Sequence, residues 1–184
     1  MGDKAIDAAL TAIKKLPKKN RPRIDQAALL NEELIQRIKT SKVIVSVQPL
    51  VAASEFNVYS AIEHLGEERA RWLYPLKTLF NKGICVCSGS DCPMEPLNPL
   101  LAIQSAVNRQ TYPEEQISVE EALQMYTTNA AYANHEENTK GTIEEGKLAD
   151  FTVLSQSPFD VPPNKIQDIA IEMTIINGKI IHPR

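Results

Sequence analysis

The sequence predicts an α/β fold in which parallel strand-helix units are followed by a small antiparallel sheet. Between residues 3 and 130, helical patterns alternate with short apolar or β-branched runs, the order typical of parallel βα units. After about Gly141 short strands take over, and Asn177-Gly178 joins two of them with the sequence of a type I′ hairpin turn. The 184 residues, 43% of them hydrophobic, can bury one sizeable core, so two large domains are not expected.

The first elements are a helix, a short strand, a second helix and a second strand. Residues 3–16 carry apolar side chains at helical spacing and end before a proline. Residues 23–27 are a short possible strand. Asn31 is expected to cap the second helix, whose first turn carries two glutamates that favour the helix dipole. Residues 43–47 are β-branched almost throughout and form the clearest strand in the sequence.

A loop with short helical pieces leads to the third strand. Residues 67–82 have a helical pattern that ends at a glycine, and Pro75 is expected to interrupt or kink that helix. The apolar run at residues 84–87 has the length of a strand and no helical period. Small residues follow this run, and Pro93 blocks further pairing. The third strand therefore delivers Asp91 to a loop at its C-terminal end.

Two further helices and three strands complete the predicted fold. A proline-rich loop precedes a helical segment around residues 100–109. Ser118-Val119-Glu120-Glu121 has the form of a capping box, and the apolar face of the helix that follows it is expected to continue to Ala130. The strands of the tail are expected at residues 151–154, 169–176 and 179–182.

Charge and composition argue against nucleic acid or a membrane as a partner. The net charge is −3 and the isoelectric point is about 5.7. The one basic cluster, residues 14–23, contains no aromatic side chain and is interpreted as a solvated helix end and loop rather than a phosphate site. No segment reaches the roughly 18 apolar residues of a membrane span, and the N-terminus lacks an apolar signal region. A cytoplasmic protein is expected.

The three cysteines are interpreted as free, buried thiols. Without a signal peptide they do not indicate a disulfide framework. Cys85 and Cys87 share one face of the third strand and Cys92 lies just beyond it, but this spacing lacks the second cysteine pair of a zinc module. A structural metal site or a redox site is the weaker alternative.

Asp91 is the leading candidate for a functional residue. Barrel and open α/β enzymes keep reactive groups at strand C-termini, where the strand is rigid and the loop is open to substrate. Taken alone, an Asp in this position more often caps the next turn or helix. The local pattern therefore leaves both roles open.

Ordered motifs along the chain carry a family resemblance. They are Gly2-Asp3-Lys4-Ala5, Arg23-Ile24-Asp25-Gln26-Ala27, Val45-Ser46-Val47-Gln48-Pro49, Gly89-Ser90-Asp91 with Pro93 and Asn98-Pro99-Leu100, Thr128-Asn129-Ala130-Ala131, and residues 141–150. On these residues the chain resembles the C-terminal part of a metal-dependent hydrolase of the amidohydrolase superfamily, in its D-aminoacylase-like and exoenzyme-regulatory-like branch. The most specific stretch, residues 141–150, resembles the return of that family's chain from the barrel into its β-sandwich. The resemblance covers nearly the whole chain but only the last part of the family's usual length.

The resemblance implies a partial (β/α)8 TIM barrel with a β-sandwich segment. Residues 1–140 would supply about the last three βα units of the barrel, and residues 141–184 the C-terminal β element. A closed barrel takes about 250 residues, so open strand edges and an exposed apolar layer are expected. A homo-oligomer or an N-terminal partner segment would cover these surfaces.

The resemblance also implies a divalent metal, usually zinc, at the strand ends. Asp91 matches the family's final Asp, whose implied role is to contact the metal and accept a proton from the metal-bound water that attacks an amide carbonyl. Gln26 stands where the family has a histidine, and an amide oxygen is a weak zinc ligand. No H-x-H pair occurs, and His64, His135 and His182 are interpreted as surface or helix-end residues.

Two functional hypotheses remain. The preferred one is a fragment of a metal-dependent amidohydrolase that acts on non-peptide carbon-nitrogen bonds of a small amide-like substrate, with Asp91 as proton shuttle, and that is inactive as an isolated chain. The ordered motifs ending in Asp91 motivate it. The alternative is a non-catalytic oligomeric scaffold or binding module derived from that family, which the missing ligands motivate.

Overall fold

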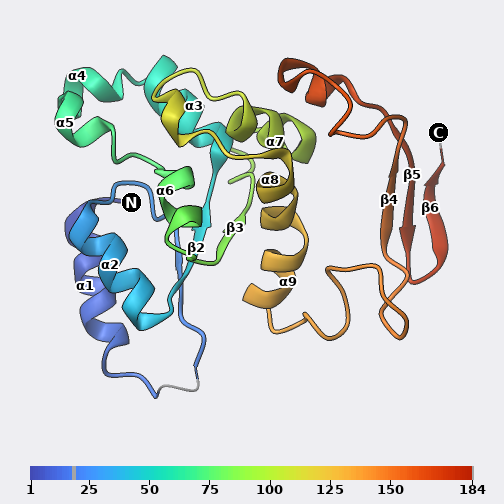
Figure 1. The fold of residues 1–184 in the computed structure, drawn as a ribbon, viewed down its shortest axis with the longest axis horizontal. Helices are drawn as coiled ribbons and strands as arrows, with labels where there is room; N and C mark the ends of the chain where they lie inside the picture. Colours follow the sequence, from blue (N-terminus) through green and yellow to red (C-terminus); the bar gives the residue numbers. More distant parts are fainter. Residues whose placement is uncertain (18–19, 184) are drawn as a thin grey trace.

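A computed structural model describes residues 1–17 and 20–183, so Lys18 and Lys19 of the basic cluster lie outside the described residues. Two three-stranded sheets are present (Figure 1). The parallel sheet has the order β1 (Arg23–Asp25), β2 (Ile44–Val47) and β3 (Val86–Ser88). The antiparallel sheet has the order β4 (Phe151–Leu154), β5 (Ile171–Ile176) and β6 (Lys179–Pro183). The α/β fold, its parallel βα units and its small antiparallel sheet are thereby confirmed.

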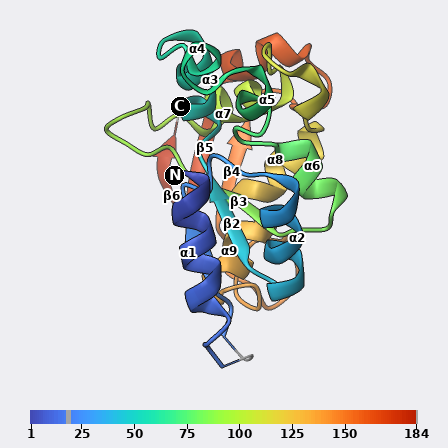
Figure 2. The same ribbon diagram turned by 90° about the vertical axis from the view of Figure 1, so that its left-hand side faces the viewer.

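The helices are α1 (Asp3–Ile13), α2 (Glu32–Ser41), α3 (Pro49–Asn57), α4 (Ala61–Leu65), α5 (Glu67–Ala70), α6 (Leu76–Asn81), α7 (Pro99–Val107), α8 (Val119–Tyr126) and α9 (Thr128–Ala133), with 3-10 turns η1 (Pro113–Glu115) and η2 (Pro163–Asp168). Figure 1 shows α1 and α2 on one side of the parallel sheet and α8 and α9 on the other, with the antiparallel sheet farther out beyond them. Figure 2, turned by 90°, shows α1 lying along the side of the molecule. In the part of the chain that the structure describes, no helix combines the length and apolar character needed to span a bilayer.

The two faces of the parallel sheet carry different side chains, because side chains alternate along each strand. One row in register across the sheet is buried and aliphatic: Ile24, Val45 and Val86. The row on the opposite face is Asp25, Ser46 and Cys87. The aliphatic row belongs to the main hydrophobic core, so the polar face is left to line a site.

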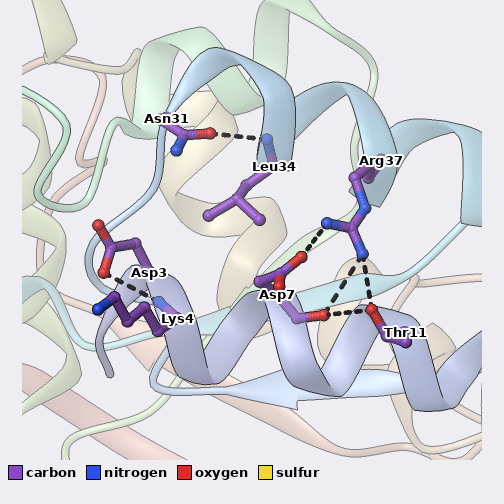
Figure 3. Close-up of polar contacts among 7 residues, drawn as sticks. All are labelled: Asp3, Lys4, Asp7, Thr11, Asn31, Leu34 and Arg37. Atoms are coloured by element: carbon purple, nitrogen blue, oxygen red, sulfur yellow. Dashed lines mark hydrogen bonds and ion pairs between the residues drawn. The ribbon is translucent and has the colours of Figure 1, made fainter.

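Helices α1 and α2 are joined by polar contacts (Figure 3). The Asn31 side chain accepts a hydrogen bond from the Leu34 backbone N–H at 2.8 Å, which confirms the predicted cap of α2. The guanidinium of Arg37 in α2 pairs with the Asp7 carboxylate and donates to the Thr11 hydroxyl at 3.2 Å, both in α1. These bonds fix the first helical pair beside β1 and β2.

The predicted helix at residues 67–82 is split into two helices by a non-helical segment rather than bent at a single kink. Helix α5 ends at Ala70, Leu73 forms an isolated bridge with Leu29, and α6 begins only at Leu76, just after Pro75. Proline has no N–H and disfavours helix in the residue before it, so the chain leaves the helix here and pairs with the segment after β1 instead.

The predicted helix after Ser118 is also two helices. The capping box is present, with the Ser118 hydroxyl and the Glu121 side chain bonded to each other's backbone N–H groups. Expecting one helix as far as Ala130 was wrong, because Thr127 leaves helical geometry (φ −122°, ψ −95°). The break lets the Asn129 side chain donate to the Val86 carbonyl at 2.9 Å, on the side of β3 that faces away from β2.

The tail contributes a hairpin and part of the main core. Asn177 and Gly178 both have positive φ (49° and 75°), which confirms the type I′ turn. The strand expected at residues 169–176 begins at Ile171. Ile166 and Ile169 are buried in the main core, and the chain around Ile166 forms the 3-10 turn η2 instead.

Candidate functional site

The C-terminal ends of the three parallel strands meet at one rim. Gln26 follows β1, Gln48 follows β2 and Asp91 lies shortly after β3. Neighbouring strands lie about 4.8 Å apart, so residues at matching strand ends come together. The pocket at this rim is lined by Arg23, Asp25, Gln26, Ser46, Gln48, Cys87, Ser88, Asp91, Ala130, Ala133 and Asn134. It lies over the polar face of the sheet, with α9 as one wall.

The structure brings the two predicted site residues into contact. Gln26 Nε2 donates a hydrogen bond to Asp91 Oδ2 at 3.0 Å. Both residues adopt left-handed backbone geometry, with φ of 53° for Gln26 and 62° for Asp91. Residues other than glycine enter this region at a cost and are held there by their surroundings. The carboxylate is therefore exposed at the rim but fixed by an amide donor from the neighbouring loop, while metal binding by either residue stays a prediction.

A second carboxylate in the pocket is already paired. Arg23 Nε donates to Asp25 Oδ1 at 2.7 Å, and Arg23 Nη1 donates to Asn134 Oδ1 at 3.2 Å. The hydrogen bond to Asp25 raises the pKa of Arg23 above its ordinary value, although burial opposes this. Asp25 is thus paired with an internal cation, whereas the partner of the Asp91 carboxylate among the described residues is the neutral amide of Gln26.

Two buried polar groups near Asp91 lack partners among the described residues. Gln48 is 6% exposed and its Oε1 has no hydrogen bond. Tyr74 is 1% exposed with an unpaired hydroxyl, and its pKa is raised by burial and then by the negative charges of Glu55 and Asp91. Sequence reasoning missed both groups. Gln48 was visible only as a member of the motif Val45-Ser46-Val47-Gln48-Pro49.

The thiols do not form a metal site within the described residues. Cys85, Cys87 and Cys92 are all free. Cys87 is buried and Cys85 partly buried, and burial raises the pKa of Cys87 and that of Cys85 to about 11. The interpretation as buried free thiols is confirmed for these two, but it was wrong for Cys92, which lies exposed on the loop after Asp91.

The histidines lie on the surface, as expected. His64 in α4, His135 after α9 and His182 in β6 are all exposed. None of the three lines the pocket that contains Asp91.

The described residues do not make a complete metal site by themselves. Among them, no group of three or more His, Cys, Asp or Glu side chains is placed to hold an ion. At the rim, the oxygen atoms that could ligate a metal ion belong to the Asp91 carboxylate and to side-chain amides. The Gln26 amide nitrogen already donates a hydrogen bond to Asp91. Because a zinc site in an enzyme takes about three protein ligands, a metal here needs further ligands from outside the described residues.

A carboxylate at the C-terminal rim of parallel βα units, above a polar pocket, is the arrangement in which α/β enzymes keep their reactive groups. The comparison with protein families is more specific. The model of the amidohydrolase family matches residues 1–182, and the chain therefore belongs to the amidohydrolase family. The predicted membership of the amidohydrolase superfamily is confirmed.

Individual relatives agree with this assignment. YtcJ of Bacillus subtilis is 38% identical over 195 residues, covering all of this chain and 36% of that protein. The N-substituted formamide deformylase of Arthrobacter pascens is 26% identical over 194 residues, again covering all of this chain and 36% of that protein. An uncharacterized metal-dependent hydrolase from Pyrococcus furiosus has a solved structure that matches with a TM-score of 0.78 at 37% identity, over 87% of this chain and 33% of its own. The chain thus spans about a third of the length of its relatives.

Proposed function

We propose that this chain is the part of a carbon-nitrogen hydrolase that carries the proton-transferring Asp91, and that it is inactive in isolation. Family membership supports the reaction class. The single observation that supports the role of Asp91 is its position, exposed at the strand-end rim and held by Gln26 at 3.0 Å. The expected substrate is a small amide-like molecule. N-substituted formamides are the first class to try, since one relative is named as their deformylase.

In this proposal the three parallel strands are the last three of a (β/α)8 barrel. Residues 1–140 form the barrel portion and residues 141–184 a β-sandwich segment. The remaining strands, and the other ligands of a divalent metal for which zinc is the proposed identity, come from an N-terminal segment of the same polypeptide or from a partner. We expect the complete protein to act in the cytoplasm.

The chemistry assigned to Asp91 is proton transfer. As a water oxygen attacks the amide carbonyl carbon, the Asp91 carboxylate accepts the water's proton. The same proton then passes to the nitrogen, the carbon-nitrogen bond breaks, and a carboxylic acid and an amine leave. The Gln26 N–H keeps the Asp91 carboxylate in one orientation through both steps.

The test is the Asp91→Asn variant of the complete protein, loaded with zinc and assayed by amine release from N-substituted formamides. Wild type is expected to turn over, and the variant to lose about 10²- to 10⁴-fold in kcat, the usual contribution of a positioned acid-base group. Asp160→Asn is the matched control, because Asp160 is exposed and lies outside the pocket. Absence of turnover by wild type across formamides and other amides contradicts the proposal.

One observation favours the scaffold alternative, namely the absence of a complete metal ligand set within the described residues. A scaffold is expected to form an oligomer that chelator leaves intact and that Asp91→Ala does not alter. Loss of fold or activity on chelation argues for the hydrolase instead.

A further inference from the structure

The loop that joins β3 to α7, residues 89–98, carries apolar side chains that the folded chain leaves open to solvent. Met94 is 68% exposed and Leu97 is 71% exposed. Figure 2 shows this loop (yellow-green) standing out from the body of the molecule, on the side away from α2 and α6. Neither side chain belongs to the main hydrophobic core, so packing among the described residues does not account for them.

Two more exposed apolar side chains lie beside this loop. Val58 and Tyr59, just after α3, are 69% and 53% exposed. Their backbone N–H groups donate to the Ser54 carbonyl at 2.8 and 3.1 Å, and the Ser54 hydroxyl donates to Glu95 Oε1 at 2.5 Å. Singly exposed apolar residues are ordinary on a surface, but these gather from two segments around one hydrogen bond. Together they form what we call the loop patch: Val58, Tyr59, Met94 and Leu97.

The loop patch is held next to Asp91. The Met94 N–H donates to the Asp91 carbonyl at 2.9 Å, and such a tight turn places the two Cα atoms within about 7 Å of each other. At the other end of the loop, the Asn98 side chain caps α7 by accepting a hydrogen bond from the Leu100 N–H at 3.0 Å. Because both ends of the loop are fixed, its apolar side chains keep their place beside the rim.

The charge around the loop patch favours a neutral occupant. Glu95 belongs to the loop itself, and Glu55 lines a hollow together with Val58 and Tyr59. Residues 48–66 and 89–98 contain no lysine or arginine. An anionic group brought here would meet like charges and lose hydration without gaining a counter-charge from these two segments.

A small substrate fits this surface better than a second copy of the chain. A stable protein interface takes about 20–30 residues on each side, which is far more than four side chains. Small-molecule sites instead combine a few polar groups with apolar walls, and βα enzymes build them from the loops that follow the strands. The pocket around Asp91 supplies the polar groups, and the loop patch supplies an apolar surface beside it.

We propose that the loop patch holds an uncharged, apolar substituent on the nitrogen of the amide that Asp91 cleaves. This inference rests on the proposed function, since it assumes that an amide is bound at Asp91. It narrows the substrate class to N-alkyl or N-aryl formamides that carry no anionic group.

Three formamides that differ only in the nitrogen substituent test this specificity. N-hexylformamide has an apolar chain, N-methylformamide has almost none, and 6-formamidohexanoate ends the same six-carbon chain in a carboxylate. Binding is measured by calorimetry on the complete protein in an Asp91→Asn background, so that no probe is consumed. N-hexylformamide is expected to bind at least about tenfold more tightly than either other probe, because its methylene groups leave water and it carries no charge.

The double variant Met94→Ser with Leu97→Ser removes half of the loop patch. Its preference for N-hexylformamide over N-methylformamide should fall to about threefold or less. Its thermal unfolding midpoint should stay unchanged, because both side chains are exposed. The matched control is Ile143→Ser with Phe159→Ser, which removes two apolar side chains that are 84% and 61% exposed in the tail. The control should keep the full preference.

Glu95→Gln separates charge from apolar contact. Glutamine keeps an oxygen that can accept the Ser54 hydroxyl, so the loop and the preference for the hexyl chain over the methyl group should persist. The affinity for 6-formamidohexanoate should rise about threefold or more, because one negative charge is removed. An unchanged affinity for that probe overturns the selection against anions.

The remaining outcomes separate this inference from the proposed function. Equal affinity for N-hexylformamide and N-methylformamide, binding of neither, or a preference that survives in the Met94→Ser, Leu97→Ser variant overturns the inference. A drop of several degrees in the unfolding midpoint of that variant, or dissociation of an oligomer, also overturns it, because the patch then packs against protein. If the preference depends on the loop patch but wild type releases no amine, the patch keeps its role and the proposed function fails. If amine is released but the preference does not depend on the patch, the hydrolase stands and this inference fails.

Discussion

Gln26 combines its hydrogen bond to Asp91 with an unfavourable backbone conformation, so the stability and the activity of the protein should respond differently to its replacement. Its N–H holds Asp91 at 3.0 Å and its φ is 53°. Gln26→Ala and Gln26→Gly both remove the amide, and both are expected to lower kcat of the complete protein by about tenfold or more. Only glycine relaxes the left-handed backbone, so Gln26→Gly should exceed Gln26→Ala in free energy of unfolding by about 1 kcal/mol.

Urea unfolding and steady-state kinetics on the same two variants check this prediction. Equal stability of the two variants would show that the left-handed conformation of Gln26 carries no cost. Unchanged kcat in both would show that Asp91 does not depend on the Gln26 amide.

The thiols should differ in reactivity according to their burial. Cys92 is exposed, whereas burial raises the pKa of Cys87 and lifts that of Cys85 to about 11. Thiolate is the reactive form, so at pH 8 Cys85 presents about a hundredfold less thiolate than a thiol of pKa 9.0. A disulfide reagent should therefore titrate one thiol rapidly in the folded chain and all three in denaturant. Three rapid thiols in the folded chain contradict this placement.

At the scale of elements, Arg109 holds together segments that sequence patterns treat separately. Its guanidinium donates to the carbonyls of Leu73, Tyr74 and Thr111 at 3.0, 2.6 and 2.7 Å, and it lies over the Phe56 ring. With 8% exposure, it supplies donors to the non-helical segment between α5 and α6. The loop after α7 thereby fixes the segment that carries Tyr74.

Arg109→Met is expected to lower the free energy of unfolding by about 3 to 5 kcal/mol, because three carbonyls lose a charged donor. Arg109→Lys should recover little of this, since a single ammonium cannot reproduce the planar fork of donors. Arg71→Met is the control: Arg71 is exposed, and a change within about 0.5 kcal/mol is expected. Urea denaturation of the three variants decides the point, and full rescue by lysine would mean that charge alone matters here.

The elements that the sequence predicted well are those whose signals are local. The Asn31 cap, the Ser118 capping box and the Asn177-Gly178 turn each depend on residues within one turn of the chain, and all three form. The break at Thr127 was missed because the interaction that it allows lies far away in the sequence: the Asn129 side chain donates a hydrogen bond to the Val86 carbonyl in β3. Apolar periodicity continues across such a break and gives no sign of it.

At the scale of the whole molecule, motif order placed Asp91 and Gln26 in one site, but it could not supply their geometry. Their contact joins residues far apart in sequence and depends on the parallel pairing of β1, β2 and β3. The unpaired oxygen of Gln48 could not be predicted from the sequence either, since the hydrogen-bond partners of a side chain depend on the packed fold. Residue types thus indicated the chemistry, whereas the strand order determined which groups meet.

The antiparallel sheet should make the isolated chain self-associate. Ile180 of β6 pairs with Ile175, so it lies on the opposite face from Ile176, and these two side chains are 57% and 51% exposed; Ile181, at the bulge in β6, is also 57% exposed. A small sheet with apolar side chains open on both faces, and with β6 at its edge, offers a surface for another chain. We expect sedimentation velocity of the 184-residue chain to show concentration-dependent association, weakened at least about tenfold by Ile180→Lys with Ile181→Lys.

His182→Lys is the matched control, because it adds a cation to the same strand without removing an aliphatic side chain. It should leave the association of the isolated chain nearly unchanged. In the complete protein, residues from outside this chain are expected to cover the sheet, so the same double substitution should lower the free energy of unfolding rather than change the oligomeric state. If the unsubstituted chain is a monomer at every concentration, the exposed side chains of β6 do not mediate self-association.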